Sequence, residues 1–198
     1  TCRRAVVVHA APVSGHVVAQ LLQQHGQGAV EVEAVAAPAA LHDPLDLGDY
    51  LGHGGYRGLH RALEIGPAAT VQQVIDSGLR GRGGAAFPTG VKWQTVATQQ
   101  ATPKFIACNA DEGDSGTFSD RMLMEGDPFA LIEGMTIAGV AVGASQGYVY
   151  LRAEYPHAYA TLHAAIVAAR AAGYLGSDIC GSGRCFDMEL RLGAGAYI

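Results

Sequence analysis

The stretch over residues 78–93, GLRGRGGAAFPTGVKW, constrains the fold more than any other part of the chain. Its density of glycines does not suit a regular helix or strand, because glycine loses more conformational freedom on folding than any other residue. Gly81, Gly83 and Gly84 allow positive φ angles and close approach of a ligand to the main chain. Successive main-chain N–H groups in such a loop form an anion-binding concavity. The sequence therefore predicts a ligand-binding loop.

Basic and aromatic side chains accompany these glycines. Arg80, Arg82 and Lys92 add positive charge, which favours a phosphorylated ligand. Phe87 and Trp93 offer flat apolar faces to a ring system. A ligand with both a phosphate and a planar ring, which means a nucleotide or a flavin, suits this combination. The alternative is an ordinary mobile surface loop.

Residues 81–86 also match the dinucleotide-binding pattern G-x-G-x-x-A. That pattern requires a preceding strand, whereas residues 70–77 predict a helix. Thr70 and Gln73 have the spacing of a capping box at its start, and Gly78 is expected to end it. The order of helix and then loop excludes a standard Rossmann fingerprint at this position.

An acidic segment, NADEGDS at residues 109–115, follows a short strand predicted over residues 104–108. Open α/β sheets bind their ligands at the carboxyl ends of the strands. Asp111, Glu112 and Asp114 place three carboxylates within four residues, which suits a ligand that supplies hydrogen-bond donors. A flavin ring edge, a ribose diol and an amide all supply them. The alternative is a solvated acidic turn, since turns favour these residue types.

Helices and strands alternate along the rest of the chain, which predicts an α/β fold. Asp127 and Pro128 are expected to begin a helix that is apolar nearly all round and therefore buried. Strands are predicted over residues 147–152 and 186–192, with a helix that begins at Pro156 between them. Before the glycine-rich stretch, residues 5–35 indicate a strand, a helix and a strand, and residues 36–55 a linker.

Composition limits the class of protein. The chain is 49% apolar and 16% charged, and its net charge of −5 argues against nucleic acid, which binds basic surfaces. The apolar run over residues 129–144 contains Glu133 and is too short to cross a bilayer, and no signal peptide is recognisable. We expect a cytoplasmic protein without direct membrane insertion.

The four cysteines do not form a recognisable metal site. Cys2, Cys108, Cys180 and Cys185 contain no C-x-x-C pair, and the C-x₄-C spacing of the last two matches only part of an iron–sulfur pattern. We expect no metal within these 198 residues. A disulfide is not expected in a reducing compartment.

Three segments together resemble one family: GLRGRGGAAFPTGVKW, ACNADEGDSGTFSDRMLMEGDPFALIEGM and the closing LGAGAYI. They are similar to the flavin-binding subunits of NADH-oxidising complexes. These are the 51-kilodalton flavoprotein subunit of complex I, the diaphorase subunits of NAD-reducing hydrogenases, and the β subunit of NAD-dependent formate dehydrogenases. The resemblance covers residues 54–198, and the variant NADEGDSGTFSDR favours the formate dehydrogenase branch.

This resemblance implies a Rossmann-like FMN-binding domain of the complex I 51-kilodalton type over residues 46–198. Residues 1–45 resemble part of a thioredoxin-like module, with a plain α/β segment as the alternative. The family continues beyond the position of residue 198 with more flavin contacts and a region that binds a 4Fe-4S cluster. We therefore expect this chain to be part of a longer subunit, truncated at its carboxyl end, with the cluster only in the missing part.

The function implied is FMN-dependent NADH dehydrogenase (diaphorase) activity, which passes electrons between NAD(H) and the iron–sulfur subunits of a larger complex. The family's flavin contacts fall on Gly81, Arg82, Gly83, Lys92, Asn109, Asp111, Glu112 and Tyr197, and Gly84 belongs to the same loop. Lys92 is expected to meet the flavin or its phosphate. Glu112 is expected near the reacting face of the flavin, where its charge tunes the reaction.

For the dinucleotide, the resemblance implies that Phe87 stacks on a ring of NAD(H). Asp114 falls where complex I has a glutamate near the dinucleotide, and Thr95 falls where it has a second stacking phenylalanine. Two other functions remain open. A non-catalytic nucleotide-binding assembly subunit would be favoured by loss of Glu112 or Lys92, but both are present. A Mg²⁺-dependent phosphate-transfer enzyme lacks its G-x-x-x-x-G-K-[ST] motif here.

Overall fold

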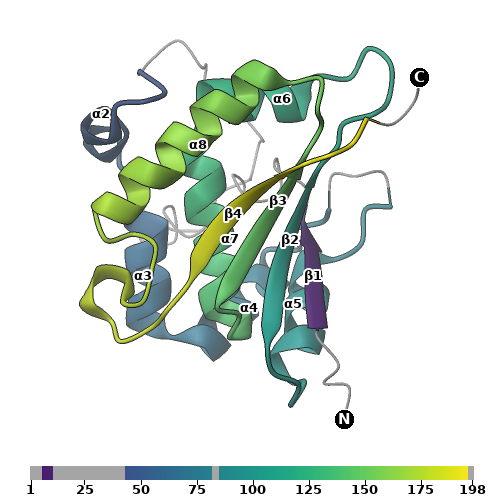
Figure 1. Cartoon of the computed structure of the whole chain (residues 1–198). Helices are drawn as coiled ribbons and strands as arrows, with labels where there is room; N and C mark the ends of the chain where they lie inside the picture. Colours follow the sequence, from purple (N-terminus) through teal and green to yellow (C-terminus); the bar gives the residue numbers. More distant parts are fainter. Residues whose placement is uncertain (1–5, 11–42, 82–84, 196–198) are drawn as a thin grey trace.

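One parallel sheet organises the molecule. The computed structural model describes residues 6–10, 43–81 and 85–195. Four strands, β1 (Val6–Ala10), β2 (Lys104–Ala110), β3 (Gln146–Leu151) and β4 (Asp187–Leu192), lie in the order β1-β2-β3-β4, and every neighbouring pair is parallel (Figure 1). The predicted α/β fold is confirmed. The expected strands after residue 100 match β2, β3 and β4 to within two residues.

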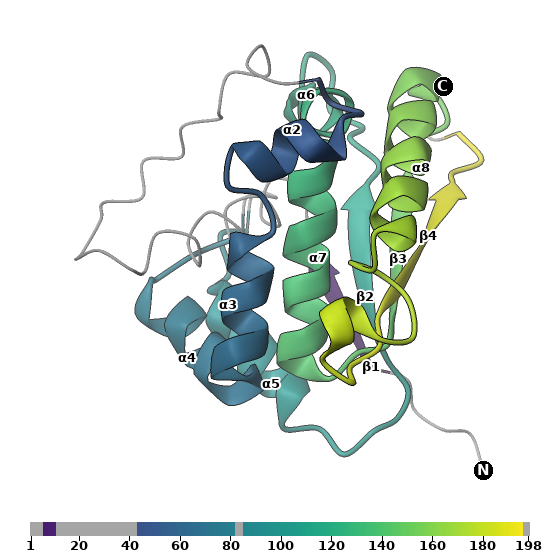
Figure 2. The ribbon, with the colours of Figure 1, turned by 90° about the vertical axis from the view of Figure 1, so that its left-hand side faces the viewer.

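Helices cover one face of this sheet. Helix α7 (Pro128–Val142) connects β2 to β3, and α8 (Pro156–Ala171) connects β3 to β4. Because both crossovers run in the same direction between adjacent parallel strands, right-handed connections place both helices on the same face. Figures 1 and 2 show them there with α5 (Thr89–Ala97), which packs against β1 and α7. Side chains such as Asn109 and Tyr150 are exposed on the strands.

Helix α7 is the centre of the core, and all of its residues are buried. The sheet lies on one side of it, while α3 (Arg57–Ile65) and α4 (Pro67–Asp76) pack on the other (Figure 2). A helix enclosed on every side must be apolar on every side, as its sequence predicts. Its start is also as predicted, because the Asp127 carboxylate accepts a hydrogen bond from the Ala130 N–H at 3.2 Å and Pro128 is the first helical residue.

The predicted start of α4 at Thr70 is wrong. The helix begins three residues earlier, at Pro67, with Gly66 as its N-cap at φ 82°. Proline is preorganised for the first helical position and loses no helical hydrogen bond there. Thr70 is buried inside the helix, and its hydroxyl donates to the Gly66 carbonyl at 2.8 Å. The T-x-x-Q spacing was therefore not a capping box.

Lys104 shows how α5 and α7 are oriented. Its Nζ atom donates to the carbonyls of Ala97 and Val142, at 3.1 and 3.0 Å. These are the last residues of α5 and α7, and Lys104 is the first residue of β2. Both helices therefore run antiparallel to β2. Their amino-terminal ends, which carry the positive end of the helix dipole, point toward the carboxyl edge of the sheet.

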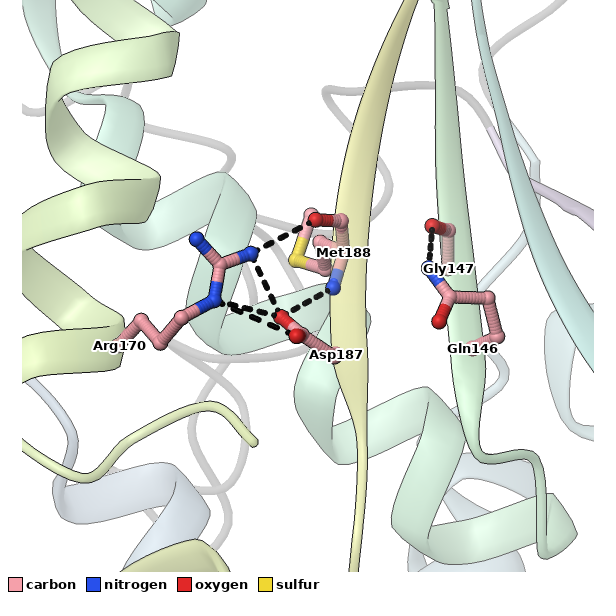
Figure 3. Close-up of polar contacts among 5 residues, drawn as sticks. All are labelled: Gln146, Gly147, Arg170, Asp187 and Met188. Atoms are coloured by element: carbon pink, nitrogen blue, oxygen red, sulfur yellow. Dashed lines mark hydrogen bonds and ion pairs between the residues drawn. The ribbon is translucent and has the colours of Figure 1, made fainter. Parts of the chain in front are cut away.

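An ion pair holds α8 to the edge strand β4 (Figure 3). The Arg170 guanidinium donates to the Asp187 carboxylate at 2.8 Å and to the Met188 carbonyl at 3.1 Å, and the same carboxylate accepts the Met188 N–H at 2.8 Å. These contacts lie on the side of β4 away from β3. The main-chain N–H and carbonyl of Met188 are therefore both hydrogen-bonded, so this sheet edge is less able to pair with another strand.

The smaller elements complete the fold. Helix α2 (Leu47–Gly52) precedes α3, helix α6 (Ser119–Gly126) lies between β2 and α7, and a short 3₁₀ turn, η1 (Ile179–Gly181), precedes β4. No helix in the described ranges is long and apolar enough to cross a membrane.

The amino-terminal segment is described only at β1. The strand predicted near residues 5–9 is present there, and it pairs with β2 in the main sheet, with Val8 opposite Ile106. The helix and strand expected over residues 14–35 lie outside the described residues. The division of the chain at residue 45 and the thioredoxin-like character of residues 1–45 stay predictions.

Candidate functional site at the carboxyl edge of the sheet

The acidic segment begins at the carboxyl end of β2. The strand is two residues longer than predicted, so Asn109 belongs to β2 and is exposed, while Asp111 follows the strand and is half-buried. The Asn109 side-chain carbonyl accepts the Asp111 N–H at 3.2 Å, which fixes the turn out of the strand. Asp114 is exposed in the loop that follows.

Glu112 is the buried carboxylate of this segment, with an exposed fraction of 8%. Its carboxylate accepts hydrogen bonds from the Ser119 hydroxyl at 3.2 Å and from the main-chain N–H groups of Asp120 and Arg121 at 3.1 and 3.3 Å. These donors form the first turn of α6, whose own N-cap residue, Phe118, contributes no side-chain cap. Glu112 thus caps α6, and the positive end of that helix stabilises its negative charge.

A second group of residues holds Glu112 from the end of β3. The Tyr155 hydroxyl donates to Glu112 Oε2 at 3.3 Å, and the Arg152 guanidinium donates to the Glu112 main-chain carbonyl at 2.5 Å. The guanidinium carbons of Arg121 and Arg152 lie 5.4 and 5.7 Å from the centre of the Tyr155 ring. Desolvation, and next the Glu112 charge, raises the pKa of Tyr155.

Sequence reasoning missed Arg152 and Tyr155. The signal that could have found them is their place in the chain, because they follow β3 directly. In a parallel sheet, residues after neighbouring strands meet at the same edge. The pairing of Asn109 with Tyr150 across β2 and β3 brings the two strand ends together.

The glycine-rich loop is closed at its base. Arg80 and Pro88 form an isolated antiparallel bridge, and the Gly81 N–H donates to the Phe87 carbonyl at 2.9 Å. The Arg80 guanidinium donates to the Ala86 carbonyl at 3.0 Å. Gly81 does not adopt the positive φ that glycine allows, whereas Ala86 has φ 49°.

Three of the predicted loop residues, Arg82, Gly83 and Gly84, lie outside the described residues, as does Tyr197 at the end of the chain. Their roles as cofactor contacts stay predictions.

Helix α5 follows the loop with an amino-terminal end that carries no side-chain cap, because Pro88 is its N-cap residue. Lys92 lies just after the first turn, and its Nζ atom is 6.0 Å from the centre of the Phe87 ring, which is half exposed. Gly90 has a packing role, since a Cβ atom there would lie 2.6 Å from the main chain of Ile75 in α4. Thr95 is exposed and bonds its hydroxyl to the Val91 carbonyl.

The described cysteines show no cluster-binding geometry. Cys108 is buried, and burial strongly raises the pKa of its thiol, while Cys180 and Cys185 are exposed. Across residues 6–10, 43–81 and 85–195, no group of three or more His, Cys, Asp or Glu side chains is placed to hold a metal ion.

The residues at this edge fit FMN in their chemistry. The uncapped start of α5 and Lys92 offer N–H donors and positive charge, which suit a phosphate. The Asn109 amide and the Asp111 carboxylate offer a donor and acceptors for a hydroxylated chain or a polar ring edge. A model of the Nuo51 FMN-binding domain family matches residues 74–198.

The chain belongs to the Nuo51 FMN-binding domain family. It is 51% identical over 156 residues to the HndC protein of the NADP-reducing hydrogenase of Solidesulfovibrio fructosivorans, and the match covers 79% of this chain and 32% of that protein. It is 50% identical over 153 residues to a subunit of the NADH-quinone oxidoreductase of Rhizobium meliloti, with 77% and 36% covered. This Nuo51-type chain thus spans about a third of the length of these relatives.

The fold agrees with a solved structure. The crystal structure of an NAD⁺-reducing [NiFe]-hydrogenase in the H₂-reduced state matches with a TM-score of 0.58 and 37% identity, over 79% of this chain and 26% of that one. The expected Nuo51-type fold, with FMN as its cofactor, is therefore confirmed.

Proposed function

We propose that this Nuo51-type domain belongs to an FMN-dependent NADH dehydrogenase (diaphorase) that exchanges electrons between NAD(H) and the iron–sulfur clusters of a larger complex. The proposal rests on two sequence segments that the structure relates to the carboxyl edge of the sheet. The start of α5 with Lys92 points there, and the run of Asn109, Asp111 and Glu112 lies there at the end of β2. The names of the hydrogenase and quinone oxidoreductase relatives support the activity.

The chain's own residues divide the work of holding the flavin. The N–H groups at the start of α5 and the Lys92 ammonium bind the phosphate, and Asn109 and Asp111 hold the ribityl chain or the ring. When bound, FMN supplies the two-electron chemistry that accepts hydride from NADH. Glu112 holds a negative charge beside the flavin and disfavours the anionic reduced form.

The proposed contacts to the dinucleotide also come from both the glycine-rich loop and the acidic segment. Phe87 is half exposed at the base of the glycine-rich loop, where its ring is available to stack on a planar ring of NAD(H). Asp114 is exposed in the acidic segment and provides a short acceptor for a ribose hydroxyl. Because Thr95 has no aromatic face, stacking occurs on one side only.

For the electron partner, we propose an NAD-dependent formate dehydrogenase located in the cytoplasm. The segment NADEGDSGTFSDR supports this choice. Complex I and NAD-reducing hydrogenase are the alternatives, because similar proteins are named as an NADH-quinone oxidoreductase and an NAD⁺-reducing hydrogenase. The partners are then iron–sulfur subunits, and a 4Fe-4S cluster belongs to the same subunit beyond the segment in this chain.

The first experiment tests flavin binding in the full-length protein. The visible spectrum of the purified protein is expected to show FMN at one per chain. Lys92→Gln is expected to weaken FMN binding by about 10- to 100-fold, since a charged hydrogen bond contributes about 1.5–3 kcal/mol. Arg61→Gln, which removes an equal charge from an exposed ion pair on α3, is the matched control and should leave binding unchanged.

Two results would overturn the proposal. Full-length protein without FMN would refute it outright, and FMN without NADH oxidation would favour a non-catalytic assembly subunit. The electron partner is tested separately in the native complex, by NAD⁺ reduction with formate or with hydrogen. Formate-dependent reduction is the expected result, and hydrogen-dependent reduction would assign the chain to a hydrogenase.

A further inference from the structure

Tyr155 lies at the centre of an arrangement that the proposed flavin chemistry has not used. Its ring is flanked by the guanidinium groups of Arg121 and Arg152, and its hydroxyl donates to Glu112 Oε2 at 3.3 Å. The ring comes from the residue before α8, whereas Glu112 comes from the loop after β2. The contact therefore connects two strand ends through one carboxylate.

The two arginines beside Tyr155 are already engaged with other carboxylates. Arg121 Nε lies 3.0 Å from Glu125 Oε1, and Arg152 Nε lies 3.0 Å from Glu154 Oε2. Arg152 reaches Glu112 only at its main-chain carbonyl. The Glu112 carboxylate itself is thus held by hydroxyl and N–H donors, which leave its negative charge in place but spread it over several hydrogen bonds.

We propose that Tyr155 is a positioning residue that tunes the reduction potential of the bound flavin through Glu112. This inference rests on the proposed function, because it takes Glu112 to lie beside the flavin. The Tyr155 hydroxyl withdraws part of the negative charge from Oε2 and fixes the direction of the carboxylate. Arg152 fixes the main chain of the same residue. The flavin then experiences a Glu112 charge that is weaker and better placed than a freely solvated carboxylate.

A hydroxyl is the group that this role requires. The apolar and cation–π contacts of the ring with Arg121 and Arg152 would persist with phenylalanine, since they depend on the ring alone. Only the hydrogen bond to Glu112 needs the oxygen. Tyr155→Phe therefore removes one donor to Glu112 and keeps the packing.

The test measures the midpoint potential of bound FMN by redox titration. In Tyr155→Phe the Glu112 charge is less dispersed, so the reduced flavin is disfavoured and the potential is expected to fall. In the Glu112→Gln background the same change is expected to have no effect, because no carboxylate is left to tune. Tyr159→Phe, one turn further along α8 and beside His163, is the matched control and should leave the potential unchanged.

A second variant keeps the proposal testable if Tyr155→Phe does not fold. Ser119→Ala removes the other side-chain donor, on Oε1, from a different helix, and should also lower the potential. In protein without FMN, a double-mutant cycle of Tyr155→Phe and Glu112→Gln, read by urea unfolding, should show a favourable coupling between the two side chains.

The outcomes separate this inference from the proposed function. Absence of FMN from the unchanged protein refutes the proposed function. Normal FMN content with an unchanged potential in Tyr155→Phe and Ser119→Ala overturns the tuning role alone. An equal shift in the presence and absence of the Glu112 carboxylate would show that Tyr155 acts through packing, and that result also overturns the inference.

Discussion

Glu133 in α7 and Glu112 after β2 are both carboxylates less than one-tenth exposed, and they use the same chemistry in different places. Each accepts main-chain N–H groups from the start of a helix on another element, and each accepts a tyrosine hydroxyl. What differs is the surrounding medium, because Glu133 is fully buried while Glu112 lies at the open carboxyl edge.

The Glu133 carboxylate has a structural role. Its carboxylate accepts the Tyr50 hydroxyl at 2.6 Å and the N–H groups of Tyr56 and Leu59 at 2.8 and 2.9 Å. Tyr56 is the N-cap residue of α3, has φ 60° and supplies no side-chain cap. Glu133 therefore caps α3 from inside the core and ties α2, α3 and α7 together. No ligand can approach a charge enclosed in this way.

In the proposed function, position alone distinguishes the two capping carboxylates. Both carboxylates stabilise a helix start, but only Glu112 lies beside the residues that fit a flavin. Each of the following predictions tests one side of this difference.

The largest effect is expected from Glu133→Gln. The amide would face the Tyr56 and Leu59 donors with one acceptor atom fewer and without charge, so the free energy of unfolding should fall by about 3 kcal/mol. Glu112→Gln should cost about 1 kcal/mol, as for other helix caps near solvent. Urea unfolding measures both losses in free energy, which are comparable when the m-values are equal. Equal losses would show that burial does not distinguish the two sites.

The next effect concerns high pH. Burial, followed by the Glu133 charge, raises the pKa of Tyr50 well above its usual value. The unfolded chain releases that proton at about pH 10 while the folded protein keeps it, so stability is lost as pH rises above about 10, by up to about 1.4 kcal/mol per unit.

Tyr50→Phe removes this contribution, and the free energy of unfolding should then decline less steeply between about pH 10 and pH 11. The pKa of Tyr155 is raised less, so Tyr155→Phe should change the slope less. Urea titrations at several pH values compare the three proteins. A steeper decline in Tyr50→Phe than in the unchanged protein would contradict the assignment.

The effect expected on the flavin potential corresponds to a free-energy change of similar size. In the proposed site, Glu112→Gln would remove a negative charge beside the reduced cofactor and should raise the FMN midpoint potential, by about 30 mV if the two-electron equilibrium changes tenfold. FMN content should remain near that of the unchanged protein. Glu133→Gln, in the fraction that folds, should leave the potential unchanged. A downward shift in Glu112→Gln would remove Glu112 from the flavin site.

The smallest effect is expected from Ser119→Ala. Its hydroxyl is one of several donors to Glu112 and lies in an exposed residue, so its loss should lower the free energy of unfolding by about 0.5–1 kcal/mol. Ser77→Ala at the C-cap of α4, whose hydroxyl donates to the Val74 carbonyl, is a matched comparison. A loss as large as that of Glu133→Gln would show that the contacts of Glu112 stabilise the fold to the same extent.

Local patterns predicted much of the fold. The alternation of strands and helices, the Asp127–Pro128 start of α7 and the apolar character of that helix all follow from the chain itself, because propensity, capping and periodicity act over a few residues. The capping box at Thr70 failed because Pro67 offered a better start three residues earlier. Glycine allows a positive φ at Gly81, but in the structure Ala86 adopts one and Gly81 does not.

The sequence by itself determined which residue types are available at the candidate site, namely the glycine-rich loop, Lys92, Phe87 and the run from Asn109 to Asp114. It also determined the family, through motifs that need no tertiary information. Only the tertiary structure decided that Glu112 caps α6, that Tyr155 and Arg152 hold it, and that Glu133 caps α3. These contacts join residues between 7 and 77 positions apart, and such pairings arise from how the strands and helices pack, which no local pattern encodes.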